Sequence, residues 1–403
     1  MTDLSCPDEP GAPDGPGAPS ALKIDMGWTL DVLLQMLRIP SPSGRTDAIM
    51  QYVGDVLTDL GLPFRLTRRG SLLVDLPGRS PGIDRALVVH SDTIGCMVRR
   101  LKDNGRLELA QVGTFSARFA EGARVKIFAE DPDRAFTGTI MPLKASGHAF
   151  GDEVDTQGIG WEHVEVRVDE EVSDGAGLAA LGIEVGNFVA LDANPEITDA
   201  GYIVSRHLDG KAGVAAALAA ARAIVAGDIV LPHRASLLVT IAEEIGQGAS
   251  HGLDAEVAEM ISVDNAVCAP GQHSIEDGVT IPLGDMTGPF DYHLTRRLCR
   301  LCRDHDIPHA RDLFKWYRSD VAAALEAGAG TRAALVAFGL DGSHGWERTH
   351  VRSVEAVAQL LTVWLQTPLT FARWDATPTG ALEDFPSSRQ PAPTEQWGRL
   401  TDD

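Results

Sequence analysis

Four short, mostly apolar runs place the strongest limit on the fold of this chain. They are Ala86–Val89, Ala235–Ile241, Met260–Val263 and Ala334–Phe338. Runs of this kind lack a regular polar face, which is typical of strands that are covered on both sides of a sheet. Because segments with helical periodicity separate them, the sequence predicts an α/β domain built around a central sheet.

The helices expected to cover this sheet have apolar residues at the spacing of one helical face. They span residues 28–38, 46–60, 211–227, 292–305, 319–327 and 354–365. Two further strands, 64–67 and 71–74, are expected on either side of the turn at Arg69–Gly70. These elements all lie before residue 94 or after residue 197, and none lies between these positions.

The middle of the chain has a different character. Between residues 94 and 197 helical periodicity disappears, and short strand candidates alternate with turns rich in Gly and Asp. The strand candidates are 107–110, 124–128, 137–140, 164–168 and 188–191. An all-β block between α/β segments indicates a separate domain, so we expect a small β-barrel or sandwich inserted at 94–197.

The expected domain organisation follows from this insertion. The α/β domain would consist of residues 23–93 and 198–370, interrupted by the β domain. Residues 1–22, rich in Asp, Pro and Gly, are expected to form a disordered leader. Residues 371–403, rich in Pro, Thr and Asp, are expected to form a loose tail.

Charge and composition exclude several classes of function. A formal net charge of -22 over 403 residues argues against nucleic acid or an anionic membrane as a partner. No apolar run approaches the roughly 20 residues of a membrane span, and no secretory signal is visible at the N-terminus. The five cysteines are odd in number and scattered, which favours a reducing cytoplasm.

One cysteine pair raises the question of a structural zinc site. Cys299 and Cys302 are followed by His305 and His309, but the chain has no second pair of this spacing. The segment continues the amphipathic helix that begins near Tyr292. We therefore interpret the pair as part of a helix surface rather than as a zinc ligand set.

Acidic and histidine side chains gather where the expected strands end. His90 ends the first run, Glu243 and Glu244 follow the second, and Asp264 follows the third. In addition, Asp209 lies where a helix begins and His344 follows the last strand. Functional groups of α/β sheets collect at the carboxyl ends of the strands, so we expect these residues to converge on one cleft.

The residue types indicate a metal centre, although a Glu-Glu pair alone is usually an exposed acidic turn. Two His, two Asp and one Glu form a nitrogen and oxygen ligand set that suits zinc, cobalt or manganese. A shared carboxylate can hold two divalent ions roughly 3.5–4 Å apart. The remaining Glu of the pair would then be free to act as a general base.

These motifs together resemble the glutamyl or tetrahedral aminopeptidase family, dinuclear zinc exopeptidases of peptidase family 42 in clan MH. The resemblance covers roughly residues 28–365 and includes the insert. It rests on His90-x-Asp92, on 208–213 (LDGKAG), on 243–246 (EEIG), on Val263–Asp264, on His344 and on 182–189 (GIEVGNFV) near the end of the insert.

The resemblance implies a role for each of these residues. Asp209 would bridge two metal ions, most often zinc; His90 and Asp264 would complete one ion, and Glu244 and His344 the other. Glu243 would act as general base on the metal-bridged water and later return the proton to the leaving amine. Asp92 would lie behind His90 and fix its tautomer.

The resemblance also implies a fold and an assembly. The fold would be the mixed-sheet zinc-exopeptidase fold, which is similar to phosphorylases and hydrolases. The insert would be the dimerisation domain, and relatives build dodecameric tetrahedral shells from such dimers. The expected reaction is removal of the N-terminal residue from short peptides or a peptide-like amide.

Departures from the family pattern leave alternatives open. Thr93 replaces a usual Glu, Asn265 replaces a usual Val, and the last motif is changed, so that His350 competes with His344 as the last ligand. The spacing after the last strand favours His344. The same departures resemble a bacterial subgroup linked to the osmoprotectant N-acetylglutaminylglutamine amide. Two alternative functions stay open. The chain could be a deacylase that uses the same metal core, or a catalytically inactive metal-binding assembly protein.

Overall fold

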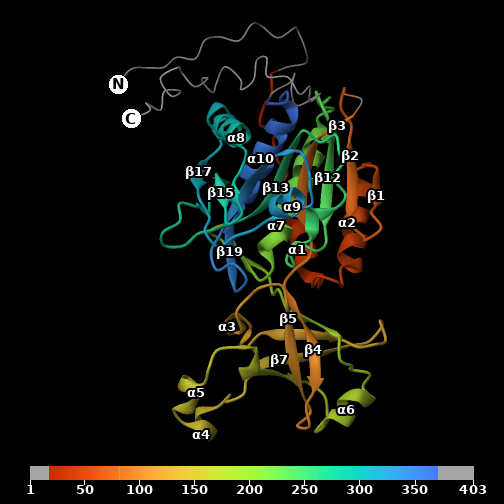
Figure 1. Cartoon of the computed structure of the whole chain (residues 1–403), viewed down its shortest axis with the longest axis vertical. Coiled ribbons are helices and arrows are strands. Elements are labelled where there is room, and N and C mark those ends of the chain that lie inside the picture. The colour runs from red at the N-terminus through yellow and green to blue at the C-terminus, as the bar shows by residue number, and fades with distance from the viewer. Residues whose placement is uncertain (1–17, 81, 371–403) are drawn as a thin grey trace, which may run out of the picture.

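A large mixed sheet forms the centre of the computed structural model, which describes residues 18–80 and 82–370 (Figure 1). Its strand order is β1-β2-β12-β3-β13-β18-β14-β17. The strands are β1 (Phe64–Leu66), β2 (Leu72–Leu76), β3 (Ile83–His90), β12 (Arg234–Thr240), β13 (Glu259–Val267), β14 (Val279–Pro282), β17 (His309–Asp312) and β18 (Arg332–Leu340).

Four parallel strands make up the middle of this sheet. β12 pairs with β3, β3 with β13 and β13 with β18, all in parallel, whereas β2 and β14 flank them in antiparallel orientation. These four strands contain the four apolar runs of the sequence. Since their carboxyl ends lie at one edge of the sheet, residues distant in sequence meet there.

Helices and loops cover both faces of the sheet, which explains why the central strands are apolar throughout. Leu87 and Val89 belong to one core, together with residues of α1 (Met26–Arg38), α2 (Asp47–Asp59), α7 (Leu208–Ala226), α8 (Tyr292–Asp304) and α10 (Val351–Gln366). Ala86 and Val88 belong to the core on the other face, with residues of α9 (Asp320–Glu326). The alternation along β3 is the period of two that a strand imposes.

A closed six-stranded barrel forms a second lobe below the sheet in Figure 1. Its strand order is β4-β5-β8-β7-β6-β9, and β9 pairs back onto β4. The strands are β4 (Gly95–Leu101), β5 (Arg106–Val112), β6 (Arg124–Phe128), β7 (Ala135–Pro142), β8 (Val164–Val168) and β9 (Phe188–Leu191). The barrel has its own hydrophobic core, so it packs as an independent unit.

Smaller elements complete the two lobes. The barrel loops carry α3 (Ala117–Ala120), α4 (Gly147–Phe150), α5 (Glu153–Thr156) and α6 (Gly175–Ala180). A three-stranded sheet consists of β10 (Glu196–Ile197), β11 (Tyr202–Ser205) and β19 (Glu347–His350). A short hairpin consists of β15 (Gly284–Asp285) and β16 (Gly288–Pro289).

The predicted fold class is confirmed, with differences in detail. The mixed α/β sheet and the inserted barrel are both present, and all six expected helices occur within a few residues of their expected bounds. The strands that were not predicted are β4, β10, β11, β14, β15, β16, β17 and β19. Strand β13 continues three residues past Asp264, which was expected to end it.

Parts of the predicted organisation stay predictions. Most of the expected leader and the whole expected tail lie outside the described residues. The boundaries of the discontinuous domain likewise stay a prediction, although the first and last barrel strands fall inside the expected insert. Among the described residues, every helix is too short or too polar to cross a membrane.

A buried ion pair closes the sheet at the amino ends of β3 and β13. Arg85 and Glu259 are cross-strand partners, both fully buried, with 3.1 Å between Nη2 and Oε2. Arg85 also donates to the main-chain oxygens of Trp364 and Thr367, which anchors the end of α10. A buried charge needs such partners, because an unpaired one is strongly destabilising.

Candidate metal centre

The predicted site residues lie at the carboxyl edge of the sheet. His90 is the last residue of β3 and is paired in register with Thr240, the last residue of β12. Glu243 and Glu244 follow in the turn after β12. Asp264 lies two residues beyond Ser262, the last residue of β13 that pairs with β3, so it is at the point where the strands diverge.

A kinked helix start brings Asp209 to the same place. His207, which precedes α7, has a left-handed backbone with φ 65°, and Gly210 has φ 74°. A Cβ atom on Gly210 would lie 2.4 Å from Cε1 of His90. Only glycine permits this close approach, which places the first turn of α7 directly against the His90 ring.

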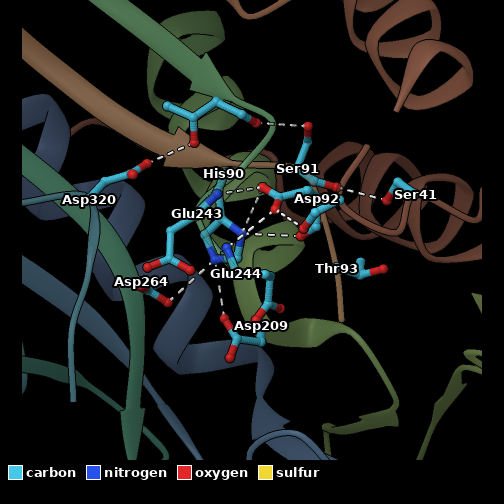
Figure 2. A network of polar contacts seen from close by, with 12 residues as sticks. Ser41, His90, Ser91, Asp92, Thr93, Asp209, Glu243, Glu244, Asp264 and Asp320 are labelled. Carbon is cyan, nitrogen blue, oxygen red and sulfur yellow. Dashed lines mark hydrogen bonds and ion pairs between the residues drawn. The ribbon is translucent and has the colours of Figure 1, made fainter. Parts of the chain in front are cut away.

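Six side chains form two contiguous groups of candidate ligands. One group is His90, Glu243 and Asp264; the other is Asp209, Glu244 and His344. Within each group the donor atoms lie within 4.8 Å of one another. Figure 2 shows five of these six side chains pointing toward one another from β3, α7, the turn after β12, and β13.

Asp209 links the two groups through its two carboxylate oxygens. Oδ1 lies 3.2 Å from Nε2 of His90, and Oδ2 lies 3.2 Å from Nε2 of His344. The same imidazole nitrogens lie 3.7 Å from Oδ1 of Asp264 and 3.4 Å from Oε2 of Glu244. A carboxylate that divides its oxygens between two ligand groups is the arrangement that a bridged pair of ions requires.

Asp92 forms hydrogen bonds with several parts of the site. It is fully buried, and its carboxylate accepts hydrogen bonds from the main-chain N–H groups of Glu243 and Glu244 and from the hydroxyl of Ser43. The His90 Nδ1 atom donates to the main-chain oxygen of Asp92 at 3.1 Å, whereas the carboxylate oxygen lies 3.6 Å away. Asp92 thus orients the Glu243–Glu244 turn as well as the His90 ring (Figure 2).

The last histidine is anchored by the barrel lobe. His344 Nδ1 donates to the main-chain oxygen of Thr114, just beyond the end of β5, at 2.8 Å. His350, the alternative ligand, lies elsewhere: its Nε2 donates to the main-chain oxygen of Ala200, and its Nδ1 accepts from Arg352 N at the start of α10. Of the two histidines, the structure brings only His344 to the carboxylates.

The cluster contains more acidic groups than basic ones, with four carboxylates and two imidazoles. Burial raises the pKa values of Glu243, Glu244 and Asp264, and neighbouring carboxylates raise them further. Burial would lower the pKa of His90, but hydrogen bonds that its ring donates to Asp209, Asp264 and Asp92 outweigh this effect and raise that pKa well above its usual value. The cluster therefore attracts cations strongly.

The residues present fit divalent metal ions. In both imidazoles Nδ1 donates to a carbonyl oxygen, which leaves Nε2, the atom that faces the carboxylates, to coordinate a metal ion in place of its proton. This outer hydrogen bond is the usual support of a metal-ligating histidine. The set of imidazole nitrogens and carboxylate oxygens suits zinc, cobalt or manganese and does not distinguish between them.

The cluster opens into a cavity of about 610 Å³. Its floor includes Asp209, Glu243, Glu244 and Asp264, and its walls come from several loops. The wall residues include Gly113, Thr114, Ile245, Asn265, Met286, Trp316, Tyr317, Arg318, Ser343 and His344. Because the barrel lobe contributes Gly113 and Thr114, the cavity is built by both lobes.

Two residues of the site were not assigned a role from the sequence. Glu347 is buried and accepts from the N–H groups of Leu208, Asp209 and His344, so it joins the two turns that carry Asp209 and His344. Asn265 Nδ2 donates to Asp209 Oδ2 at 2.8 Å and to Asp264 Oδ1 at 3.2 Å. The sequence does place each of them near a predicted ligand: Asn265 directly follows Asp264, and Glu347 lies three residues after His344.

Two further groups lie near the site or bear on an earlier expectation. Asp320 is the first residue of α9, which Ser319 caps, and its carboxylate accepts from Thr240 Oγ1 and Ala249 N, which fixes the end of β12. Cys299 and Cys302 are free thiols in the hydrophobic core, rather than on the helix surface as expected. Among the described residues neither belongs to a metal-ligand group.

Comparison with known proteins gives consistent results. A family model described as M42 glutamyl aminopeptidase matches residues 70–360. YhfE of Bacillus subtilis (strain 168), named as a candidate aminopeptidase, is 35% identical over 341 residues, covering 85% of this chain and 98% of YhfE.

Solved structures resemble the chain over most of its length. An aminopeptidase from the archaeon Desulfurococcus kamchatkensis matches with a TM-score of 0.77 at 17% identity, covering 87% of this chain and 97% of that one. The TET1 peptidase of Pyrococcus horikoshii is described as assembling into a tetrahedron or a large octahedral shell. It matches with a TM-score of 0.72 at 19% identity, and the match covers 84% of this chain and 99% of that one. At these identities the likeness shows the shared fold.

Proposed function

Because the chain belongs to the M42 glutamyl aminopeptidase family of metal-dependent peptidases, we propose that it removes N-terminal residues from short peptides at a dinuclear metal centre. The observation that carries the proposal is the position of Asp209. Its two oxygens lie equally close to the imidazoles of the two ligand groups, as a bridging carboxylate requires. The family alone would not specify which residues of this chain hold the ions.

The proposed ligand set uses both groups. Asp209 would be shared, His90 and Asp264 would hold one ion, and Glu244 and His344 the other. Zinc is the expected metal, with cobalt or manganese as alternatives. When bound, such ions lower the pKa of a coordinated water to about 7 and polarise the scissile carbonyl group.

Glu243 is the residue proposed to move the proton. Its carboxyl lies in the His90 group and lines the cavity, so it can reach both the attacking water and the leaving nitrogen. Burial and the neighbouring carboxylates raise its pKa, which makes it a stronger base than an exposed Glu. It would take one proton from the water and give it to the departing amine.

A Glu243→Gln variant tests this assignment. We expect it to bind metal as the wild type does and to lose about 10²–10⁴-fold in kcat, the usual contribution of a general base. Metal per chain and turnover are measured on the same preparation, before and after chelation and again after metal is restored. Glu196→Gln, which changes an exposed carboxyl on β10, is the matched control. Full activity in Glu243→Gln would show that another group is the base.

The substrate class needs its own test, because a deacylase could use the same core. Aminoacyl anilides and short peptides are compared with N-acyl amino acids. Activity confined to the blocked substrates would replace the aminopeptidase assignment with a deacylase, and inactivity of the metal-loaded protein on both would favour an assembly protein. N-acetylglutaminylglutamine amide and its free-amine form belong in the same panel, since the osmoprotectant link rests on resemblance alone.

We also propose that the chain forms a homo-oligomer through its barrel lobe. Large apolar side chains are exposed there, including Phe150, Ile159 and Val185. A solved structure of PhTET1-12s, which this chain resembles, is described as a dodecamer, so a dodecamer is the expected state. Light scattering of the purified protein measures its mass, and a monomer would contradict the proposal.

A further inference from the structure

Two buried polar atoms of the cavity wall have no hydrogen-bond partner among the described residues. They are Oδ1 of Asn265 and the hydroxyl oxygen of Tyr317. An unpaired buried polar group is costly, so in a native structure water or a ligand usually completes it. Asn265 already donates both of its amide hydrogens, to Asp209 and Asp264, and its unpaired Oδ1 atom can only accept. The Tyr317 hydroxyl approaches the Asp264 carboxylate without forming a well-aligned hydrogen bond, so it can still donate to a ligand.

The Tyr317 side chain is held firmly in the cavity wall. Its ring packs against Phe314 with 4.8 Å between centroids, and its main-chain oxygen accepts from Met286 N at 3.2 Å. Its hydroxyl interacts with the Asp264 carboxylate, and the side chain lines the same cavity as Asp209 and Glu243. The hydroxyl therefore lies beside the proposed ligands and the proposed base, on the wall that a substrate would contact.

The surroundings decide which role this hydroxyl can perform. A buried tyrosine hydroxyl keeps its proton near neutral pH, so this group acts as a neutral donor. A fixed donor is most useful where negative charge develops during a reaction. In amide hydrolysis that place is the oxygen of the scissile carbonyl group.

We propose that Tyr317 is a catalytic residue whose hydroxyl donates a hydrogen bond to the scissile carbonyl oxygen and strengthens it as that oxygen becomes negative. The inference rests on the proposed peptidase function. In the step concerned, the water oxygen bonds to the carbonyl carbon and the carbonyl π electrons move to its oxygen. They return as the C–N bond breaks, and Glu243 carries one proton from the water to the leaving amine. Tyr317 keeps its own proton throughout.

Tyr317→Phe tests the proposal, because it removes one oxygen atom and keeps the ring packing on Phe314. We expect kcat on an aminoacyl anilide to fall about 10²–10³-fold, as when one donor to an oxyanion is removed, with little change in KM. Zinc per chain should be unchanged. The Tm should be equal or higher, because the variant no longer buries an unpaired hydroxyl.

A binding measurement separates this role from a structural one. A phosphinic dipeptide imitates the tetrahedral geometry of the transition state, and its affinity for Tyr317→Phe should fall by a factor similar to that in kcat. The affinity of the free amino acid product should not change. Tyr52→Phe, on α2 away from the cavity, is the matched control and should behave as wild type.

The outcomes distinguish the two proposals. Unchanged kcat and unchanged phosphinic affinity in Tyr317→Phe, with an active wild type, would overturn the role of Tyr317 alone. A lower Tm with unchanged phosphinic affinity would also overturn it, by showing a structural role. If the wild type cleaves no member of the substrate panel, the peptidase function fails, and equal phosphinic affinity in both proteins would then overturn the role of Tyr317 as well.

Discussion

The pair of strands β3 and β13 carries buried acidic side chains at both ends, and these are neutralised differently at the two ends. At the amino ends, Arg85 and Glu259 neutralise each other at 3.1 Å. Burial would raise the pKa of Glu259, but Arg85 and a hydrogen bond from Thr370 N outweigh it, and the pKa is lowered. At the carboxyl ends, Asp264 has a raised pKa because it is buried beside Asp209. The same two strands thus carry one satisfied carboxylate and one unsatisfied carboxylate.

The difference separates a structural charge from a functional one. The amino-end pair contains its own counter-ion and needs nothing more. The carboxyl-end cluster contains four carboxylates, and three of them form ion pairs with only two imidazoles. Both imidazoles also donate to carbonyl oxygens. Cations from outside the chain are what such a cluster can bind. The source of the neutralising charge therefore distinguishes the two kinds of buried acid in this sheet: a side chain of the protein at one end and a bound cation at the other.

The largest expected effect comes from breaking the satisfied end. Arg85→Met leaves Glu259 buried without its cation, which should lower the free energy of unfolding by about 3–5 kcal/mol. Urea denaturation measures this loss. The metal content of the folded fraction should be unchanged, because the pair lies at the opposite edge of the sheet. Arg85→Met combined with Glu259→Leu should recover part of the loss; loss of metal without loss of stability would contradict the comparison.

A smaller effect is expected from loosening the unsatisfied end. Asn265→Leu removes the amide that holds Asp209 and Asp264 in place. Outer hydrogen bonds of this kind are worth about 10–100-fold in metal affinity. Competition with a chelator measures the affinity, and both ions should be affected because Asn265 contacts both ligand groups. Asn104→Leu, in an exposed turn of the barrel, is the control.

The smallest effect concerns Glu347, a carboxylate at the same edge that is satisfied by main-chain N–H groups. Glu347→Gln retains one acceptor oxygen, which should stay with Leu208 and Asp209 and leave His344 N without its partner. We expect about a tenfold loss of affinity for the ion at His344, the lower end for such a contact. Stepwise metal titration by calorimetry should show one weakened step. Equal weakening of both steps would contradict this account.

Much of this architecture could be predicted from the sequence. The apolar runs identified β3, β12, β13 and β18, because strands covered on both faces have no polar positions. Their ends then identified His90, Asp264 and the Glu243–Glu244 pair. Strand β4 was missed, since it contains Arg99 and Arg100, and β11 and β19 are too short for a periodic signal.

The remaining features depend on loop geometry. His344 and His350 lie in one segment, and spacing could favour one but not place either ring. The role of Glu347 arises because two distant turns present N–H groups to one carboxylate. Likewise, the position of Tyr317 depends on the path of the loop before α9. Contacts of this kind have no periodicity, so a single sequence does not reveal them.

The hydrogen bond from His344 to the oxygen of Thr114 limits how this protein could be re-engineered. It makes the barrel lobe part of the candidate metal centre, although the lobe has its own core and is inserted between two segments of the large sheet. Replacing the lobe with that of a relative, or deleting it to obtain a smaller enzyme, would remove the acceptor that orients an imidazole. A successful exchange must therefore keep the end of β5 in place, so the two lobes have to be engineered together.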